Sequence, residues 1–469
     1  MAVASAITAF FAPRAVAAPT WLPPIGISAE SQVVGNPQVA VDASGDAVAV
    51  WERASGRTGT GVIEASTRPV GGSWSEPPTR LSADAQDAFV PQVAVDPGGD
   101  AVVVWQQARD QFGNYVIDAA TRPAGGIWSY APTPLSTDQS AYEPQVAVDA
   151  SGEAVAVWEG TNEKTGSYPM VVEAATLVSG GTWSDPTPLS ADTQNARSPE
   201  VAVDARGDAV AVWRRSDDKT GKSVIEAATR PSRGIWSDPP LRLSADTQDA
   251  FDPRVAVDRR GDAVAVWQRR SGKSHKFVIE AATRLAAGAW SVPTRLSGDA
   301  RSAFVPRVAV DARGDAVVVW ERNGGKKIGR RVIEAATRPS GGSWTHPPTL
   351  LSAATEDASN PQVAVDPRGD AVAVWERTRG KTERSIVEAA THPAGGDWSD
   401  SLTRLSGDTA RETELLPQVA VDACGDAVAV WGRTSAKTDG SVVETATLRH
   451  QRIGHRNRDA GTLVNRWKR

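Results

Sequence analysis

The chain of 469 residues repeats a unit of about 54 residues eight times. In its first copy the unit reads PQVAVDASGDAVAVWER, then a short variable stretch, then VIEASTRPVGGSWSEPPTRLS. A chain of this length exceeds one ordinary hydrophobic core, and a repeat of this period with several strand-like segments is typical of a β-propeller. We therefore predict a single ring of repeats rather than a series of separate domains.

Each repeat contains four segments whose patterns indicate strands, here named a to d. PQVAVD and AVAVW alternate small and branched apolar residues around a glycine-containing turn, as a hairpin does. VIEAST is the third strand, and WSEPPTRLS is a fourth whose prolines suit an outer edge, because proline donates no ladder hydrogen bond. The prediction is an all-β fold: one eight-bladed propeller of four-stranded antiparallel blades.

The first and last copies are incomplete in complementary ways. The tryptophan of strand d follows strand c in seven copies, at Trp74, Trp128, Trp183, Trp236, Trp290, Trp344 and Trp398. An eighth, Trp21, stands ahead of the first copy, and the last copy ends after strand c. We therefore expect residues 20–28 to form the outer strand of the last blade and to close a propeller that spans residues 19–448.

Two segments lie outside this predicted propeller. Residues 1–18 hold an Ala-rich apolar run and then Ala15-Val16-Ala17, which resembles the end of a secretory signal and predicts a secreted or extracytoplasmic protein. If the segment is a plain Ala-rich tail, the protein is cytoplasmic. Residues 449–469 contain seven Arg or Lys and one Asp, and we predict a basic, disordered tail. No apolar run is long enough to span a bilayer.

Charge and cysteine content limit the classes of ligand. The formal net charge is -5, and much of the basic excess lies in the tail, so the ring is acidic and a nucleic-acid-binding face is disfavoured. The single cysteine, Cys424, excludes an intrachain disulfide and a cysteine metal site. The turn that contains Asp42 lacks the alternating oxygen ligands of a calcium loop. We predict no metal, no cofactor and a monomer.

The recurring polar and aromatic residues are expected to be structural. The aspartate of each a–b turn, such as Asp42, should cap its own hairpin. The acidic residue of strand c, such as Glu64, should accept hydrogen bonds from a neighbouring strand or pair with the arginine after the threonine, such as Arg68. The tryptophans should pack between blades; the alternative is a ring of ligand-stacking indoles, most plausible on strand d.

The c–d turn from Thr67 to Trp74 reads TRPVGGSW. It resembles the Asp-box, S/T-x-D-x-G-x-T/S-W, of the sialidase-like (BNR-type) β-propeller repeat superfamily, with the aspartate replaced by Pro, Val or Leu in these degenerate copies. The resemblance implies the fold rather than an activity, with the Asp-box on the face opposite the active site. The enzymes of that family have six blades, an arginine triad, a Tyr nucleophile with a Glu partner and an acid/base Asp, and no such set is recognisable here.

Repeat length changes only between strands b and c and between strands d and a. These loops should form one face, the variable face, opposite a fixed face made of the a–b turns (42–46 in the first copy) and the c–d turns (69–73). Acids beside aromatics in the d–a loops suit a sugar. The b–c loops are largely basic, and the mixed charge of the two loop sets suits a protein partner. The candidate ligand-binding residues are Phe89, Tyr142, Phe251, Phe304, Asp84, Asp138, Asp192, Asp246 and Asp299. The other interpretation is a solvated rim whose aromatics tuck under the loops.

A symmetric ring makes eight similar environments, so a catalytic site should break the symmetry, and no such break is recognisable in the sequence. We therefore predict a secreted, non-catalytic binding or scaffold module that engages a glycan or protein repetitively through the variable face. The alternative is an exported glycoside hydrolase of sialidase-like architecture that uses carboxylates of the same face.

Overall fold

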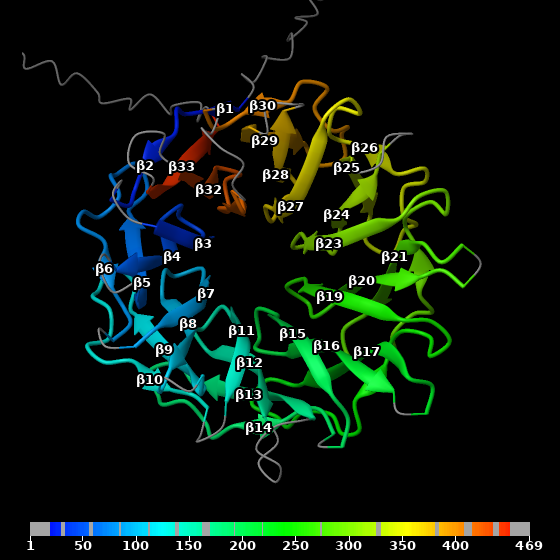
Figure 1. Cartoon of the computed structure of the whole chain (residues 1–469), viewed down its shortest axis with the longest axis horizontal. Helices are drawn as coiled ribbons and strands as arrows, with labels where there is room; N and C mark the ends of the chain where they lie inside the picture. Colours follow the sequence, from blue (N-terminus) through cyan, green and yellow to red (C-terminus); the bar gives the residue numbers. More distant parts are fainter. Residues whose placement is uncertain are drawn as a thin grey trace, which may run out of the picture.

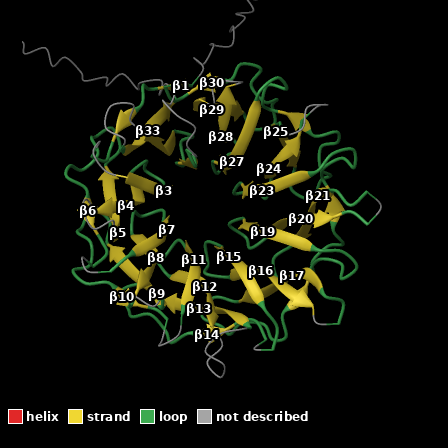
Figure 2. Cartoon of the chain, in the orientation of Figure 1, coloured by secondary structure: helices red, strands yellow, loops and turns green. Residues whose placement is uncertain are grey.

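The computed structural model describes residues 19–29, 33–55, 60–83, 86–110, 113–136, 140–161, 169–191, 193–217, 219–272, 274–324, 330–379, 384–407, 415–434 and 440–450. Within these ranges, 33 strands form eight sheets. The sheets stand around a common centre (Figure 1), and loops and turns join their strands (Figure 2). The predicted eight-bladed propeller is confirmed.

The first four blades follow one another along the chain. Blade 1 is β3 (Val33–Val41), β4 (Ala47–Ser55), β5 (Thr60–Arg68) and β6 (Thr79–Arg80). Blade 2 is β7 (Ala88–Val95), β8 (Ala101–Ala108), β9 (Tyr115–Arg122) and β10 (Thr133–Pro134). Blade 3 is β11 (Ala141–Val148), β12 (Ala154–Thr161), β13 (Met170–Leu177) and β14 (Thr187–Pro188). Blade 4 is β15 (Ala196–Val203), β16 (Ala209–Asp217), β17 (Lys222–Arg230) and β18 (Leu241–Arg242).

The remaining four blades complete the ring. Blade 5 is β19 (Ala250–Val257), β20 (Ala263–Arg270), β21 (Phe277–Arg284) and β22 (Thr294–Arg295). Blade 6 is β23 (Ala303–Val310), β24 (Ala316–Asn323), β25 (Arg331–Arg338) and β26 (Thr349–Leu350). Blade 7 is β27 (Asp357–Val365), β28 (Ala371–Arg379), β29 (Arg384–His392) and β30 (Thr403–Arg404). Blade 8 joins β31 (Gln418–Val421), β32 (Ala427–Thr434) and β33 (Ser441–Arg449) to β1 (Thr20–Trp21) and β2 (Ile25–Gly26).

Within each blade, strand a lies nearest the centre and strand d lies outermost (Figure 1). Neighbouring strands of blade 1 run antiparallel, as they do in the other blades. Successive connections therefore alternate between the two ends of a blade, which places the a–b and c–d turns on one face and the b–c and d–a loops on the other. The predicted fixed and variable faces follow directly from this topology.

The N-terminal segment closes the ring. The Ile27 amide donates to the Val443 carbonyl at 2.8 Å, and the Ser28 hydroxyl accepts from the Val443 amide at 2.8 Å. Blade 1 makes the same two bonds, with Leu81 and Ser82 on Ile63, at 2.8 and 2.9 Å. Residues 20–28 thus supply the outer strand of blade 8, as expected. Strand β33 ends at Arg449, one residue beyond the expected boundary at residue 448.

Each blade boundary packs a surface of branched residues against a surface of alanine and tryptophan. Between blades 1 and 2, Val50 and Ile63 of blade 1 pack against Trp105 of blade 2. The strand-b tryptophan is 0% exposed in every blade, at Trp51, Trp105, Trp158, Trp213, Trp267, Trp320, Trp375 and Trp431. Removing such a side chain costs about 3–5 kcal/mol. The expected packing role is confirmed for strand b, whereas the strand-d tryptophans lie half-buried at the edges of these clusters.

The acidic residue of strand c binds strand b. In blade 1, Glu64 accepts from the Trp51 indole at 3.2 Å and from Arg53 at 2.6 Å. The expected neighbouring-strand bond is therefore present. The alternative pairing with Arg68 is wrong, because that guanidinium donates to the Thr447 hydroxyl at 2.5 Å and lies over the Trp74 ring.

Blade 2 departs from this arrangement. Gln107 replaces the arginine and Asp118 replaces the glutamate, so the Trp105 indole donates to the Gln107 side chain at 3.1 Å instead. Burial raises the pKa of Asp118 to about 6, which the nearby Arg109 only partly offsets.

The turn aspartates cap their hairpins as predicted. One oxygen of Asp42 accepts from the amides of Ser44 and Gly45 at 2.8 Å and from that of Asp46 at 2.9 Å. Its other oxygen faces the turn of blade 2, 3.0 Å from where a Cβ on Gly99 would stand, and Gly99 has a φ of +98°. Only glycine fits there without strain, so each turn is locked against its neighbour.

Candidate functional site

The predicted aromatic residues of the variable face pack against one another. Phe89 and Tyr142 meet Tyr115 with ring centroids 6.2 and 5.6 Å apart. Phe251 and Phe304 meet Phe277 in the same way, at 6.0 and 5.5 Å. All six rings are half-buried, and most of the contacts are edge-to-face.

Sequence reasoning missed the central ring of each cluster. Tyr115 and Phe277 open strand c of blades 2 and 5. The signal that could have found them is an aromatic residue at the start of strand c. There, each ring lies between the strand-a aromatic of its own blade and that of the next blade.

The predicted acids of the variable face are ion-paired where the structure describes them. Asp246 lies 2.9 Å from Arg242, four residues before it, and Asp299 pairs with Arg295 in the same way. Their side chains are 48% and 58% exposed, so these are surface pairs. Asp84, Asp138 and Asp192 lie outside the described residues.

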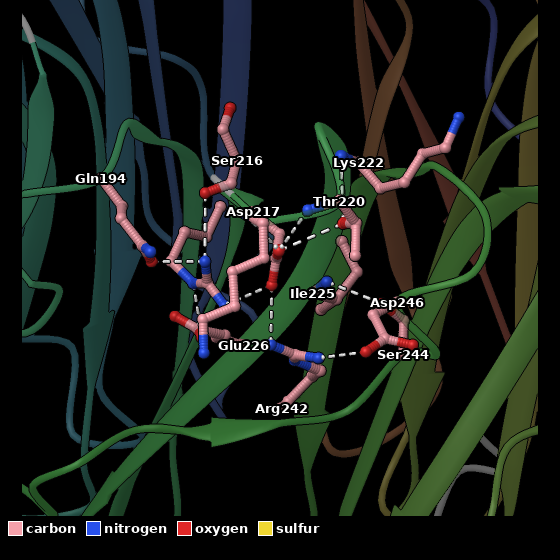
Figure 3. A network of polar contacts seen from close by, with 12 residues as sticks. Gln194, Ser216, Asp217, Thr220, Lys222, Ile225, Glu226, Arg242, Ser244 and Asp246 are labelled. Carbon is pink, nitrogen blue, oxygen red and sulfur yellow. Dashed lines mark hydrogen bonds and ion pairs between the residues drawn. The ribbon is translucent and has the colours of Figure 1, made fainter.

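Blade 4 carries an extended polar network on this face (Figure 3). Buried Arg215 donates to Glu226 at 2.6 Å, and Asp217 accepts from Arg242 at 2.8 Å. Hydrogen bonds from the Thr220 backbone and hydroxyl, together with the two arginines, hold the pKa of Asp217 below its usual range. These charges neutralise one another and fix the b–c hairpin, which leaves little for a ligand to neutralise.

Cavities lie instead between blades on the fixed face. One of them, about 420 Å³, lies at the seam, the boundary between blade 8 and blade 1. Others of about 180, 150 and 290 Å³ lie between blades 1 and 2, 4 and 5, and 5 and 6. Each is lined by an a–b turn and a c–d turn from adjacent blades. The same type of pocket therefore recurs at these four boundaries.

Each recurring pocket sets guanidinium donors beside carboxylate acceptors. The arginines come from the end of strand c, and the pockets between described blades contain Arg68, Arg122, Arg230, Arg284 and Arg338. The acid is the last residue of the a–b turn, at Asp46, Asp208 and Asp262.

These groups are held in place before any ligand arrives. Asp46 accepts from the Val70 amide at 2.6 Å. The Arg68 guanidinium lies 5.3 Å from the Trp74 ring centroid, a cation–π distance. Burial lowers the pKa of Arg68, but an arginine remains charged at neutral pH.

The seam pocket breaks the eightfold symmetry. Leu448 occupies the position of Arg68, and Arg449 and His450 occupy the positions of Pro69 and Val70. The His450 amide donates to Asp426 at 2.7 Å, and its Nδ1 lies 3.6 Å from the same carboxylate. The sequence prediction assigned Arg449 and His450 to a disordered tail, which is wrong for these two residues. Strand b pairs with β33 only as far as Leu448, and Arg449 pairs with Thr20 of β1. The signal that could have found these two residues is their alignment with Pro69 and Val70 of the first repeat.

A second break in symmetry lies around the ring's centre. The residue after the proline of strand a is glutamine in five blades, and the full set is Gln38, Gln92, Gln145, Glu200, Arg254, Arg307, Gln362 and Gln418. Arg254 pairs with Glu200 of the preceding blade, and Arg307 donates to Gln362 of the following blade at 3.2 Å. Burial and the neighbouring Arg254 lower the pKa of Arg307 to about 9. The sequence prediction concerned a catalytic break in symmetry and did not consider these positions.

No group of three or more His, Cys, Asp or Glu in the described ranges is arranged to hold a metal ion. The described residues form no helix that is long and apolar enough to cross a membrane.

No family model matches the chain, and no curated protein matches it. Among solved structures, a protein of unknown function from Dyadobacter fermentans aligns at a TM-score of 0.46 and 11% identity, over 92% of this chain and 99% of its own. The BP39L lectin from Burkholderia pseudomallei aligns at 0.49 and 14%, over 81% and 100%. A PL25 polysaccharide lyase, an ulvan lyase, aligns at 0.49 and 11%, over 83% and 97%. At such low identities and TM-scores, these structures say nothing of this chain's own ligand or activity.

Proposed function

We propose that this protein is an exported, non-catalytic scaffold that binds a repetitive carbohydrate through the interblade pockets of its fixed face. The observation that carries the proposal is the recurrence of one polar pocket at three blade boundaries, with a variant of it at the seam. A ring of similar pockets suits a polymer that repeats one chemical unit, because several weak contacts then act together.

The composition of the pockets supports a sugar. A guanidinium and a carboxylate side by side provide the donors and acceptors that neighbouring hydroxyl groups require. The recurring pockets of about 150 to 290 Å³ are smaller than the roughly 300–1,000 Å³ of sites that enclose a drug-sized ligand. They suit a small part of a chain that lies across the face.

The arrangement gives little support to catalysis in these recurring pockets. A hydrolase needs groups with distinct acid and base roles around one bond, whereas successive pockets repeat the same groups. The acids are also engaged by backbone amides, as Asp208 is by Ser232 at 2.6 Å.

The glycoside hydrolase alternative has one observation in its favour. Only the seam pocket, among the pockets described, joins two carboxylates, Asp422 and Asp426, with a histidine, His450. If the protein cleaves a glycosidic bond, D426N or H450A should abolish sugar release while leaving the other pockets able to bind.

A glycan array with a sugar-release assay on the same panel tests the proposal. In the pocket variant R122L/R284L/R338L, each arginine becomes the residue already found at that position in blades 3 and 8, Leu177 and Leu448. We expect binding to fall at least about tenfold through lost avidity, and any single substitution to weaken it only a few-fold.

The matched control is F89A/Y142A/F251A/F304A, which alters the variable face proposed from the sequence. We expect this variant to bind like the unaltered protein. Loss of binding in the aromatic variant, with the arginine variant unaffected, would move the site to the variable face. Release of sugar by the unaltered protein would contradict a non-catalytic role.

A further inference from the structure

The a–b turns of blades 4 to 7 share a substitution that the other blades lack. The third residue of the turn is arginine in these four blades, at Arg206, Arg260, Arg313 and Arg368. In the other four blades it is Ser44, Gly98, Ser151 and Cys424. Blade 5 adds Arg259 beside Arg260. All five side chains are exposed, and together they form what we name the arginine arc.

The guanidinium groups of the arc lean from one blade toward the next. Arg206 donates to the carbonyl of Arg260 at 3.5 Å, and Arg313 donates to that of Arg368 at 2.8 Å. Arg368 reaches the turn of blade 8, 3.4 Å from where a Cβ on Gly425 would stand. The charges therefore follow the ring of turns in sequence.

Two kinds of cavity open on the same face as the arc. Arg259 lines a cavity of about 460 Å³ at the centre of the ring, among the strand-a valines and the a–b turns. The interblade pockets of blades 4 to 6, with Arg230, Arg284 and Arg338, open on the same face. A chain that crosses these pockets therefore passes the arc.

The neighbouring acids are largely committed to the backbone. Asp208, Asp262 and Asp315 accept from the c–d turn amides at 2.6 to 2.7 Å. Within the arc only Arg368 has a carboxylate partner in the described contacts, Asp366 at 3.0 Å. Most of the exposed guanidiniums thus have donors available for an anion, and their planar fork matches a carboxylate or a sulfate.

We infer that the arginine arc binds the acidic groups of an anionic polysaccharide, one that carries carboxylates or sulfates on its sugars. The inference rests on the proposed carbohydrate-binding function and names the charge of the ligand. The guanidiniums are spaced one blade apart and alternate with the turn acids. That pattern suits a polymer with spaced charges better than duplex DNA, which carries a charge about every 1.7 Å along its axis.

The test measures binding to immobilised polygalacturonate, dextran sulfate and uncharged dextran, with a DNA duplex as competitor. The arc variant is R206S/R260S/R313S/R368S, which installs the serine found at Ser44 and Ser151. The matched control, R80S/R270S/R301S/R404S, removes the same charge from exposed arginines that lie outside the arc. Thermal melting of all three proteins establishes that they are folded.

We expect the unaltered protein and the control to bind at least one of the two polyanions, with affinity that falls as salt rises. The arc variant should bind it at least about tenfold more weakly. Preference for polygalacturonate identifies the carboxylate, and preference for dextran sulfate identifies the sulfate. Equal binding by the arc variant and the control would overturn the inference, as would a DNA duplex that displaces the polyanion at lower charge concentration.

The two proposals fail separately. If uncharged glycans bind and acidic groups add nothing, the arc inference is wrong and the pocket proposal stands. If polyanions bind through the arc while the pocket variant R122L/R284L/R338L binds them normally, the arc stands and the pocket proposal is wrong.

Discussion

The two faces of the ring differ in what their side chains are bonded to. On the fixed face, aspartates such as Asp42 and glycines such as Gly99 hold every turn in the same shape, and the cavities lie between those turns. On the variable face, charges such as Asp217 and Arg242 pair within a blade, and aromatic rings cover one another. The loops of the variable face differ in length from blade to blade, whereas the pockets lie between turns of constant length on the fixed face.

On the fixed face, the chemistry of a turn side chain varies from blade to blade while the shape of the turn stays constant. Functional residues are commonly found on loops of variable length, which is why sequence reasoning favoured the variable face. In this chain, one turn position changes from Ser44 to Arg206 without any change in the length of the turn. A side chain can therefore be exchanged on the fixed face while its neighbours stay in place.

The largest effect is expected from removing residues 1–28. The fixed face at the seam depends on ring closure, and this deletion removes Trp21 and Ile27 from two interblade clusters. We expect the free energy of unfolding to fall by about 5 kcal/mol or more, measured by urea denaturation. The single variant W21A should lose less. A deletion that unfolds like the intact chain would show that β1 and β2 do not close the ring.

One glycine from each face allows a direct comparison of how tightly the two faces constrain an added Cβ. G99A places a Cβ 3.0 Å from Asp42 at a φ of +98°, and we expect a loss of about 1–3 kcal/mol. G298A, in a d–a loop, meets nothing within 4 Å and should change stability by less than about 0.5 kcal/mol. Equal losses, read from the two melting curves, would mean that the fixed face is no more constrained than the variable one.

Asp118, where strand c of blade 2 departs from the repeat, should make stability depend on pH. Its pKa in the folded protein, about 6, is above the ordinary value of 3.8, so the folded state holds the proton more tightly. Stability from this group is therefore full below about pH 4 and is lost as the pH rises to about 6.

In D118N, the loss of stability between about pH 4 and pH 6 that Asp118 causes should disappear. Because Asp118 is partly exposed, we expect a difference of about 1–2 kcal/mol between pH 4 and pH 7 relative to the unaltered protein. Denaturation of both proteins across this range measures it, and parallel curves would show that Asp118 titrates normally.

Apart from the G298A control, the smallest effect is expected for the surface pairs of the variable face. D246N and D299N each break an exposed ion pair with an arginine and should cost less than about 1 kcal/mol. Neither should change glycan binding if the fixed face carries the site. A clear loss of binding with unchanged melting would place the ligand beside these acids.

The fold was predictable because each strand signal occurs eight times and the missing Trp74 equivalent is present as Trp21. The turn caps followed from the local chemistry of aspartate. The pockets were not predictable, since a volume between blades depends on how two sheets are spaced. Arg449 and His450 were missed because the basic composition of the tail outweighed their alignment with Pro69 and Val70 of the first repeat. The arginine arc was visible in the sequence, but only the fold shows that its turns are neighbours.

The closure of the ring also sets the order in which it can be made. Among the described strands, β1 and β2 are synthesised before the rest, and their partner β33 is synthesised after them all. Blades 1 to 7 each contain their own four strands and can form as the chain emerges, whereas blade 8 must await β33. The seam pocket therefore comes into existence only when an early and a late part of the same chain meet.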